Sequence, residues 1–152
     1  MADASTVARP AAAQQIRRLT GLRRASLATL VLLIVQFSVG IGVNLYVSLP
    51  TGGGASQAFS NGAGLALHVV LGLLLVVSAI GLLVQAIVAR HWPVVVAGAV
   101  GLVAMVAAAG QGFSFVHDGT NAASMGMAAA GCVALLCYAA VLYLVRPPAG
   151  RS

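Results

Sequence analysis

Three histidines and a few polar side chains are the groups in this chain that could bind a ligand or a metal. His68 is the most informative, because it is expected about five residues, or roughly 8 Å, inside an apolar stretch that begins at Ala63. A polar group at that depth is costly and marks either helix packing or function. Neutral imidazole is the commonest metal ligand in proteins, so His68 is a candidate ligand of haem or another metal. The alternative is a hydrogen bond to a neighbouring helix, for example to Asn44 or Gln111.

The other two histidines lie at the ends of apolar stretches. His117, beside Asp118, is a second candidate ligand or pH-sensitive group, and the alternative is a water-exposed loop histidine. His91, next to Trp92, is explained as part of an interfacial anchor pair. The polar side chains expected to surround a ligand at His68 are Gln36, Asn44 and Gln111.

Several kinds of chemistry are not indicated by the sequence. It contains no Ser/His/Asp set, phosphate-binding loop, HExxH pattern or CxxC pair. No carboxylate lies inside an apolar stretch, which argues against a proton pump or a cation-coupled transporter. Cys132 and Cys137 are five residues apart on one expected helix and face different sides, so they cannot pair there. An enzyme acting alone is therefore not expected.

The composition is that of a protein whose main partner is the lipid bilayer. Hydrophobic residues make up 61% of the 152 residues and charged residues only 7%, whereas a soluble domain is about one quarter charged. The net charge of +6 could suggest nucleic-acid binding. All eight cations are arginines that flank apolar stretches, however, and they form no basic folded face. We therefore expect no nucleic-acid partner.

Four stretches are long and apolar enough to cross a bilayer, at residues 25–49, 63–88, 94–115 and 122–145. The sequence thus predicts an all-α protein, an integral membrane four-helix bundle over residues 25–146. A basic segment over residues 1–24 precedes the bundle, and a short tail over residues 147–152 follows it. The first stretch has about 25 apolar residues, which favours a retained anchor over a cleaved signal peptide. Within the basic segment, Gln15–Arg24 is expected to form a short interfacial helix along the headgroups.

The arginines also predict the orientation of the bundle. With four crossings, every arginine falls on one side, and the opposite loops, Pro50–Gly62 and Val116–Asn121, contain none. The positive-inside rule then puts both termini in the cytoplasm. The Ala- and Arg-rich, Lys-free composition is typical of a high-GC bacterial genome, so the expected location is a bacterial plasma membrane.

The four spans also resemble two similar helical hairpins. Gly40-Ile41-Gly42 matches Gly110-Gln111-Gly112, and the run from His68 to Gly72 matches the run from Met127 to Gly131. In this alignment Met127 occupies the position equivalent to His68. A repeat of this kind would be parallel, about an axis normal to the membrane.

The first hairpin resembles one hairpin of the haem A synthase family, through Val31–Gln36, Gly40 and Leu67-His68 with Gly72. Members of that family consist of two similar four-helix bundles with haem-ligating histidines near the outer face. The resemblance covers residues 25–90 and implies a haem site at His68, with Met127 as a second axial ligand or His117 in a bis-histidine variant.

The chain also departs from that family. Met127 stands where the family has a histidine, Leu65 stands where it has a glutamate, and the loop Pro50–Gly62 lacks its cysteine pair. The oxidation chemistry of the family is therefore not implied. What the resemblance implies is a haem-binding membrane protein for electron transfer, haem handling or redox sensing.

Two alternatives come from other classes of protein. The Gly/Ala-rich faces of the third and fourth spans allow close helix approach, so the chain is alternatively an accessory subunit of a larger membrane complex. It would then contact a protein partner or a second copy of itself. The second alternative is a small carrier or channel formed by an oligomer.

Overall fold

The computed structural model describes residues 4–46 and 62–145. They form four helices: α1 (Ala4–Tyr46), α3 (Ala63–Val88), α4 (Trp92–Asp118) and α5 (Asn121–Leu144). No strand occurs among these residues. The last residues of the first expected span, most of the loop after it and the tail at 147–152 lie outside the described residues.

All four helices are long and apolar enough to cross a membrane. Their outward surfaces carry mostly large aliphatic side chains, such as Leu73, Val103 and Leu136, all of which are exposed. A surface of this kind is stable only against lipid or another apolar partner. The predictions of an all-α fold and a four-helix bundle are confirmed.

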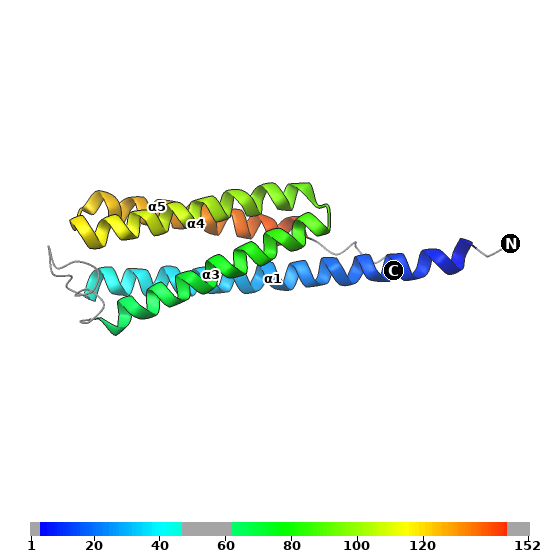
Figure 1. Ribbon diagram of the computed structural model, residues 1–152, viewed down its shortest axis with the longest axis horizontal. Coiled ribbons are helices and arrows are strands. Elements are labelled where there is room, and N and C mark those ends of the chain that lie inside the picture. Colours follow the sequence, from blue (N-terminus) through cyan, green and yellow to red (C-terminus); the bar gives the residue numbers. More distant parts are fainter. Residues whose placement is uncertain (1–3, 47–61, 146–152) are drawn as a thin grey trace.

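The helices occupy the corners of a square in chain order. α1 packs against α3 and α5, and α4 packs against the same two helices, whereas α1 and α4, like α3 and α5, are not adjacent. α4 and α5 form the closest pair, and this pair lies over the layer formed by α1 and α3 (Figure 1). Diagonal helices therefore contact each other only through side chains that reach into the centre of the bundle.

Two tight turns reverse the chain. The turn between α3 and α4 has Arg90 in the left-handed region, with φ of 54°, and Pro93 in the first turn of α4. The turn between α4 and α5 has Gly119 at φ of 66°, where the absence of a side chain removes strain. Thr120 caps α5, since its Oγ1 accepts a hydrogen bond from the backbone N–H of Ala123 at 3.4 Å.

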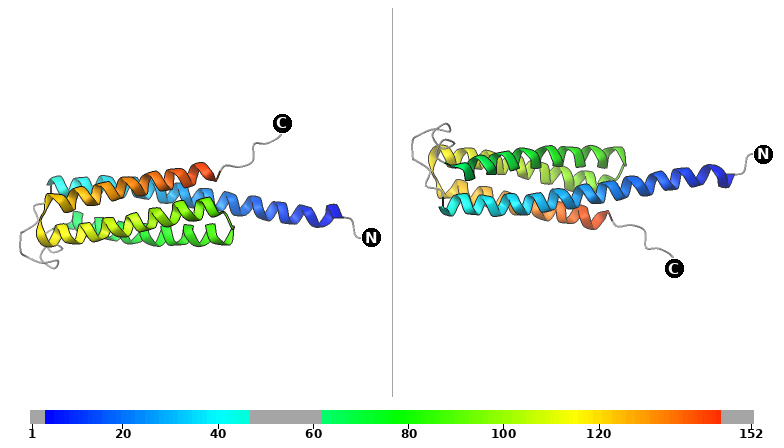
Figure 2. Two further views of the ribbon diagram at one scale, coloured as in Figure 1. Left: turned by 90° about the horizontal axis from the view of Figure 1, so that it is seen from above. Right: turned by 90° about the horizontal axis from the view of Figure 1, so that it is seen from below.

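α1 is one continuous helix that extends well beyond the other three (Figure 2). The expectation of a separate interfacial helix at Gln15–Arg24 is therefore wrong, because this segment continues in line with the span. Leu22 and Ser26 are buried against the bundle, and the Ser26 hydroxyl donates to the Leu22 carbonyl at 2.8 Å. Leu22 belongs to the main core cluster, so this part of the basic segment packs against the bundle.

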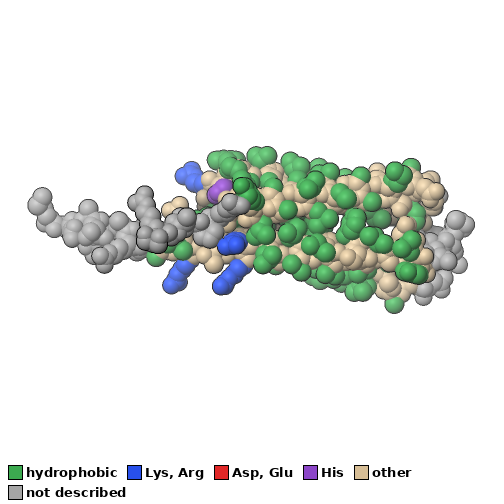
Figure 3. All heavy atoms as spheres, turned by 180° about the vertical axis from the view of Figure 1, so that it is seen from behind, with side chains coloured by type: hydrophobic (Ala, Val, Ile, Leu, Met, Phe, Trp, Pro, Cys, Tyr) green, Lys and Arg blue, Asp and Glu red, His purple; other side chains and the backbone are tan. Residues whose placement is uncertain are grey.

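The two ends of the bundle differ in charge. Figure 3 shows blue arginine side chains gathered at one end, which we call the arginine end. The arginines whose side chains are described there are Arg17, Arg18, Arg23, Arg24 and Arg90, all exposed. We call the opposite end, with the α4–α5 turn, the far end. Both described chain ends, the start of α1 and the end of α5, lie toward the arginine end (Figure 2).

Candidate functional site

The apolar core is interrupted at one level of the bundle. A large cluster of buried residues, including Leu33, Leu75 and Tyr138, fills the half nearer the arginine end. A small cluster of Val43 and Leu65, with Val39 and Val116 packed on it, closes the far end. Between the clusters, no residue of any described helix is fully buried.

This gap lies at the same depth on all four helices. It comprises residues 34–42 of α1, 66–74 of α3, 106–113 of α4 and 126–133 of α5, and we call it the open level. Nine helical residues correspond to roughly 14 Å along the bundle. Figure 3 shows background between the two layers in the half of the bundle away from the arginines. Protein interiors are normally packed without such openings, so the open level is the least filled part of the described bundle.

His68 and Gln36 form the polar centre of the open level. The Gln36 amide nitrogen lies 3.2 Å from His68 Nε2 and donates to the His68 carbonyl oxygen at 3.0 Å. Because this nitrogen has two hydrogens, it can donate to both acceptors, which makes Nε2 the unprotonated nitrogen of the neutral ring. The proton then lies on Nδ1, which is buried and has no hydrogen-bond partner among the described residues, and neither has Gln36 Oε1.

Two glycines hold this pair close to the opposite helix. A Cβ at Gly40 of α1 would lie 2.8 Å from Cε1 of His68, and a Cβ at Gly72 of α3 would lie 3.1 Å from the Gln36 amide nitrogen. Each polar side chain therefore rests on a glycine of the facing helix. Any larger residue at these glycines would displace the imidazole or the amide.

The α4–α5 pair has the same arrangement at the same depth. A Cβ at Gly126 would lie 3.0 Å from Oε1 of Gln111, and a Cβ at Gly112 would lie 3.3 Å from Sδ of Met127. In each pair of helices a glutamine and a candidate ligand thus rest on glycines of the facing helix. Gly112 contacts the candidate ligand Met127 as Gly40 contacts His68, so Gly112 is the structural counterpart of Gly40. The sequence alignment of the two hairpins instead matches Gly40 with Gly110.

The remaining predicted site residues lie near the far end. The Ser124 hydroxyl donates to Oδ1 of Asn44 at 3.3 Å, which joins α5 to α1. His117 is exposed in the last turn of α4. The structure brings Gln36 to His68, but within its described residues it shows no hydrogen bond of His68 with Asn44, Gln111, Met127 or His117. The helix-packing alternative for His68 therefore has Gln36 as its partner, in place of the Asn44 or Gln111 suggested by the sequence.

Gly40 and Gly72 belong to the site, but the sequence pattern did not connect these glycines with His68 and Gln36. Gln36 and Gly40 are four residues apart, as are His68 and Gly72. On two antiparallel helices, these equal spacings place each polar residue opposite the glycine of the other helix. This reciprocal spacing is the signal that could have identified the pair.

No cluster of three or more His, Cys, Asp or Glu side chains that could hold a bare metal ion occurs within 4–46 and 62–145. Comparison with known proteins adds no assignment: no family model, curated protein or solved structure matches this chain.

Proposed function

We propose that this chain is a multi-pass membrane protein that binds haem in the open level, where His68 would hold its iron. The observation that carries the proposal is the interruption of the core around His68, whose Nε2 lone pair accepts the Gln36 amide hydrogen. The stretch without buried residues is roughly 14 Å long, a length comparable with the edge of a planar hydrophobic molecule. Haem needs only one or two protein ligands, so a site without a larger donor cluster suits it.

The tautomer of His68 supports this proposal. A neutral imidazole binds iron through a lone pair, and here the lone pair is on Nε2, where it accepts the Gln36 amide hydrogen. Ligation therefore requires Gln36 to release this nitrogen. It requires no change of tautomer, and the Gln36 amide keeps its bond to the His68 carbonyl.

Met127 is the second proposed ligand. It lies on α5, diagonal to α3 across the bundle, at the depth of His68, and its sulphur now rests on Gly112. A bound haem supplies one-electron redox chemistry, and a His/Met pair raises its reduction potential relative to bis-histidine ligation. The chain's own residues hold the ring, orient the imidazole and exclude water. Electron transfer, haem handling and redox sensing are the roles that fit such a site.

The direct test is titration of detergent-purified protein with hemin, followed by its visible spectrum. We expect one hemin per chain, and we expect His68→Ala to lose the bound spectrum while it elutes and folds as the wild type does. His91→Ala is the matched control, because His91 lies at the arginine end outside the open level. Equal binding by wild type and His68→Ala would contradict the assignment of the ligand.

A second candidate function, an accessory subunit, is favoured by one observation. A Cβ added at Gly42, Gly81 or Gly110 would have nothing within 4 Å, so these glycines offer close approach to a helix of another protein. Gly110→Leu should then abolish co-purification of a partner without disturbing the bundle. Gly131→Leu is a poor test, since a Cβ there already lies 3.2 Å from the Phe37 ring.

The location and orientation belong to the same proposal. From the Ala- and Arg-rich, Lys-free composition we propose a bacterial plasma membrane. Because the described arginines gather at one end of the bundle, we propose that this end, and both termini, lie in the cytoplasm. His68 and the open level then lie in the half of the bilayer nearer the outside.

A further inference from the structure

The arginine end contains a groove that the haem proposal does not use. It is lined by Gln14, Arg17, Arg18 and Gly21 of α1 and by Val84, Gln85, Val88 and Ala89 of α3. It has a volume of about 470 Å³ and opens to the surface. This volume is within the range of small-molecule sites.

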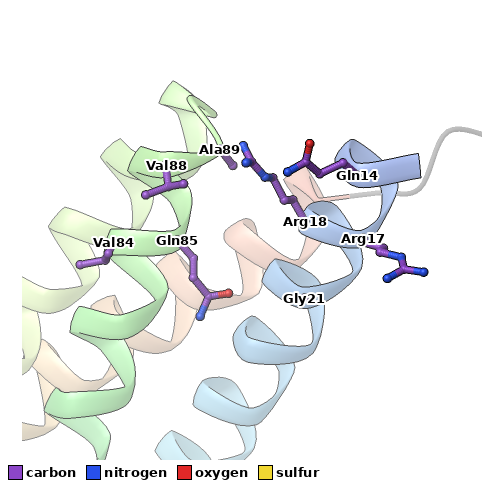
Figure 4. Close-up of a pocket in the computed structure, with 8 residues that line it drawn as sticks. All are labelled: Gln14, Arg17, Arg18, Gly21, Val84, Gln85, Val88 and Ala89. Atoms are coloured by element: carbon purple, nitrogen blue, oxygen red, sulfur yellow. The ribbon is translucent and has the colours of Figure 1, made fainter. Parts of the chain in front are cut away.

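The groove is lined by both polar and apolar residues. Figure 4 shows Arg18 reaching from α1 toward Ala89 at the end of α3, and Gln85 pointing from α3 toward α1. Arg17 points away from α3 in the same view. Val84 and Val88 are apolar lining residues on α3, and on α1 the Cβ position of Gly21 has no atom within 4 Å.

The arginines of this end have no acidic partner among the described residues. The only acids of the chain are Asp3, outside the described residues, and Asp118, at the far end. Guanidinium groups at a membrane surface without a carboxylate recruit phosphate groups, with which they form charge-assisted hydrogen bonds. Arg18 is exposed, so its guanidinium group is accessible to an anionic group from outside the described residues.

We propose that this groove binds one anionic phospholipid from the leaflet at the arginine end. Its phosphate contacts Arg18, with Gln14 and Gln85 as further hydrogen-bond donors, and its acyl chain lies along Gly21 of α1 and Val88 of α3. Such a lipid fills the space between the protruding part of α1 and the end of α3. The site is independent of the open level, which lies nearer the far end.

The test is native mass spectrometry of the protein in detergent with equal amounts of phosphatidylglycerol and phosphatidylcholine. We expect one retained phosphatidylglycerol per chain and a clear preference over phosphatidylcholine. An arginine near an anionic surface contributes about 1 kcal/mol, so Arg18→Gln should reduce phosphatidylglycerol affinity about fivefold. Arg24→Gln removes the same charge from the same helix outside the groove, and it should leave the affinity unchanged.

A second pair of variants tests the apolar part. Gly21→Leu should fill the groove and prevent retention of the lipid, while Gly81→Leu, at another open glycine, should not. Both variants should fold, because neither new side chain meets an existing atom at its Cβ.

Three outcomes would overturn the proposal. Equal losses in Arg18→Gln and Arg24→Gln would indicate only a diffuse surface charge. Displacement of the lipid by inorganic phosphate would identify a free-anion site. Reduced stability of Arg18→Gln with unchanged lipid preference would mean that Arg18 only stabilises the C-terminal end of α3, where the helix dipole is negative.

Discussion

The polar residues inside the bundle are stabilised by unusually close contacts with glycines. The His68 imidazole has the backbone of Gly40 beside it, and the Gln36 amide has that of Gly72. In a bilayer, an unsatisfied polar group is costly, and the contacts with Gln36 offset part of that cost for His68. Two buried atoms of this pair, His68 Nδ1 and Gln36 Oε1, have no hydrogen-bond partner among the described residues.

Gly40→Ala should test this packing directly. The new Cβ would lie 2.8 Å from the imidazole, so the ring must move, at a cost of about 1–3 kcal/mol that exceeds the helix-propensity gain of about 0.5–1 kcal/mol. Gly42→Ala, two residues on, meets no atom and should be neutral or slightly stabilising. Thermal unfolding in detergent measures the stability of both variants. Equal unfolding midpoints would contradict the close contact between His68 and Gly40.

The sequence identifies His68 as unusual but does not identify its partner. Its residue type and its depth in the span are sufficient to predict a role in helix packing or in function. The partner depends on how α1 and α3 are rotated about their axes, and the weak apolar periodicity of membrane helices does not define that rotation. The sequence therefore predicts Gln36 only as a nearby polar residue, whereas the bond itself is a finding of the structure.

At the level of elements, the α4–α5 pair is the most tightly packed part of the bundle. Tyr138 is fully buried, and its hydroxyl donates to the Gly98 carbonyl at 3.4 Å. Its ring lies against Gly101, where a Cβ would be 2.7 Å from the Cε2 atom and 3.2 Å from Cβ of Cys137. Small residues in the third span thus serve internal packing at this place.

Gly101→Ala should consequently destabilise the protein by about 2–3 kcal/mol, because the ring is enclosed and cannot retreat. Gly110→Ala is the control on the same helix, since a Cβ at Gly110 meets nothing. Denaturant unfolding followed by helical circular dichroism compares the two. A Gly101→Ala variant as stable as the wild type would show that the two helices are less closely packed than described.

Helix positions were predictable from length and hydropathy, and the expected span at 63–88 has the bounds of α3. The structure of the basic segment before the first span was not predictable, because its arginines are compatible with an interfacial helix as well as with a continuous one. Burial of Leu22 and Ser26 against the bundle decides between them. That burial depends on tertiary contacts, which a single-sequence pattern does not contain.

At the scale of the whole molecule, the charged side chains and the candidate site lie toward opposite ends of the described bundle. Arginines lie at one end, while the open level lies nearer the other (Figure 3). If the arginine end is cytoplasmic, the proposed haem exchanges electrons or cargo on the outer side, and the proposed lipid belongs to the inner leaflet.

This orientation can be measured with single cysteines in a Cys132→Ala/Cys137→Ala background. Asn121→Cys at the start of α5 should react with a membrane-impermeant maleimide on intact cells. Gln14→Cys, exposed at the arginine end, should react only after permeabilisation. The reverse pattern would contradict the positive-inside assignment.

The most direct test of the central claim is the visible absorption spectrum of the protein purified in mild detergent from haem-supplied cells, before and after dithionite reduction. Haem in the open level predicts a stoichiometric Soret band and sharpened bands on reduction. Met127→Leu should retain the haem and lower its reduction potential, since the thioether ligand is lost. A flat spectrum at full protein yield would contradict haem binding, and His68 would then be a packing residue paired with Gln36.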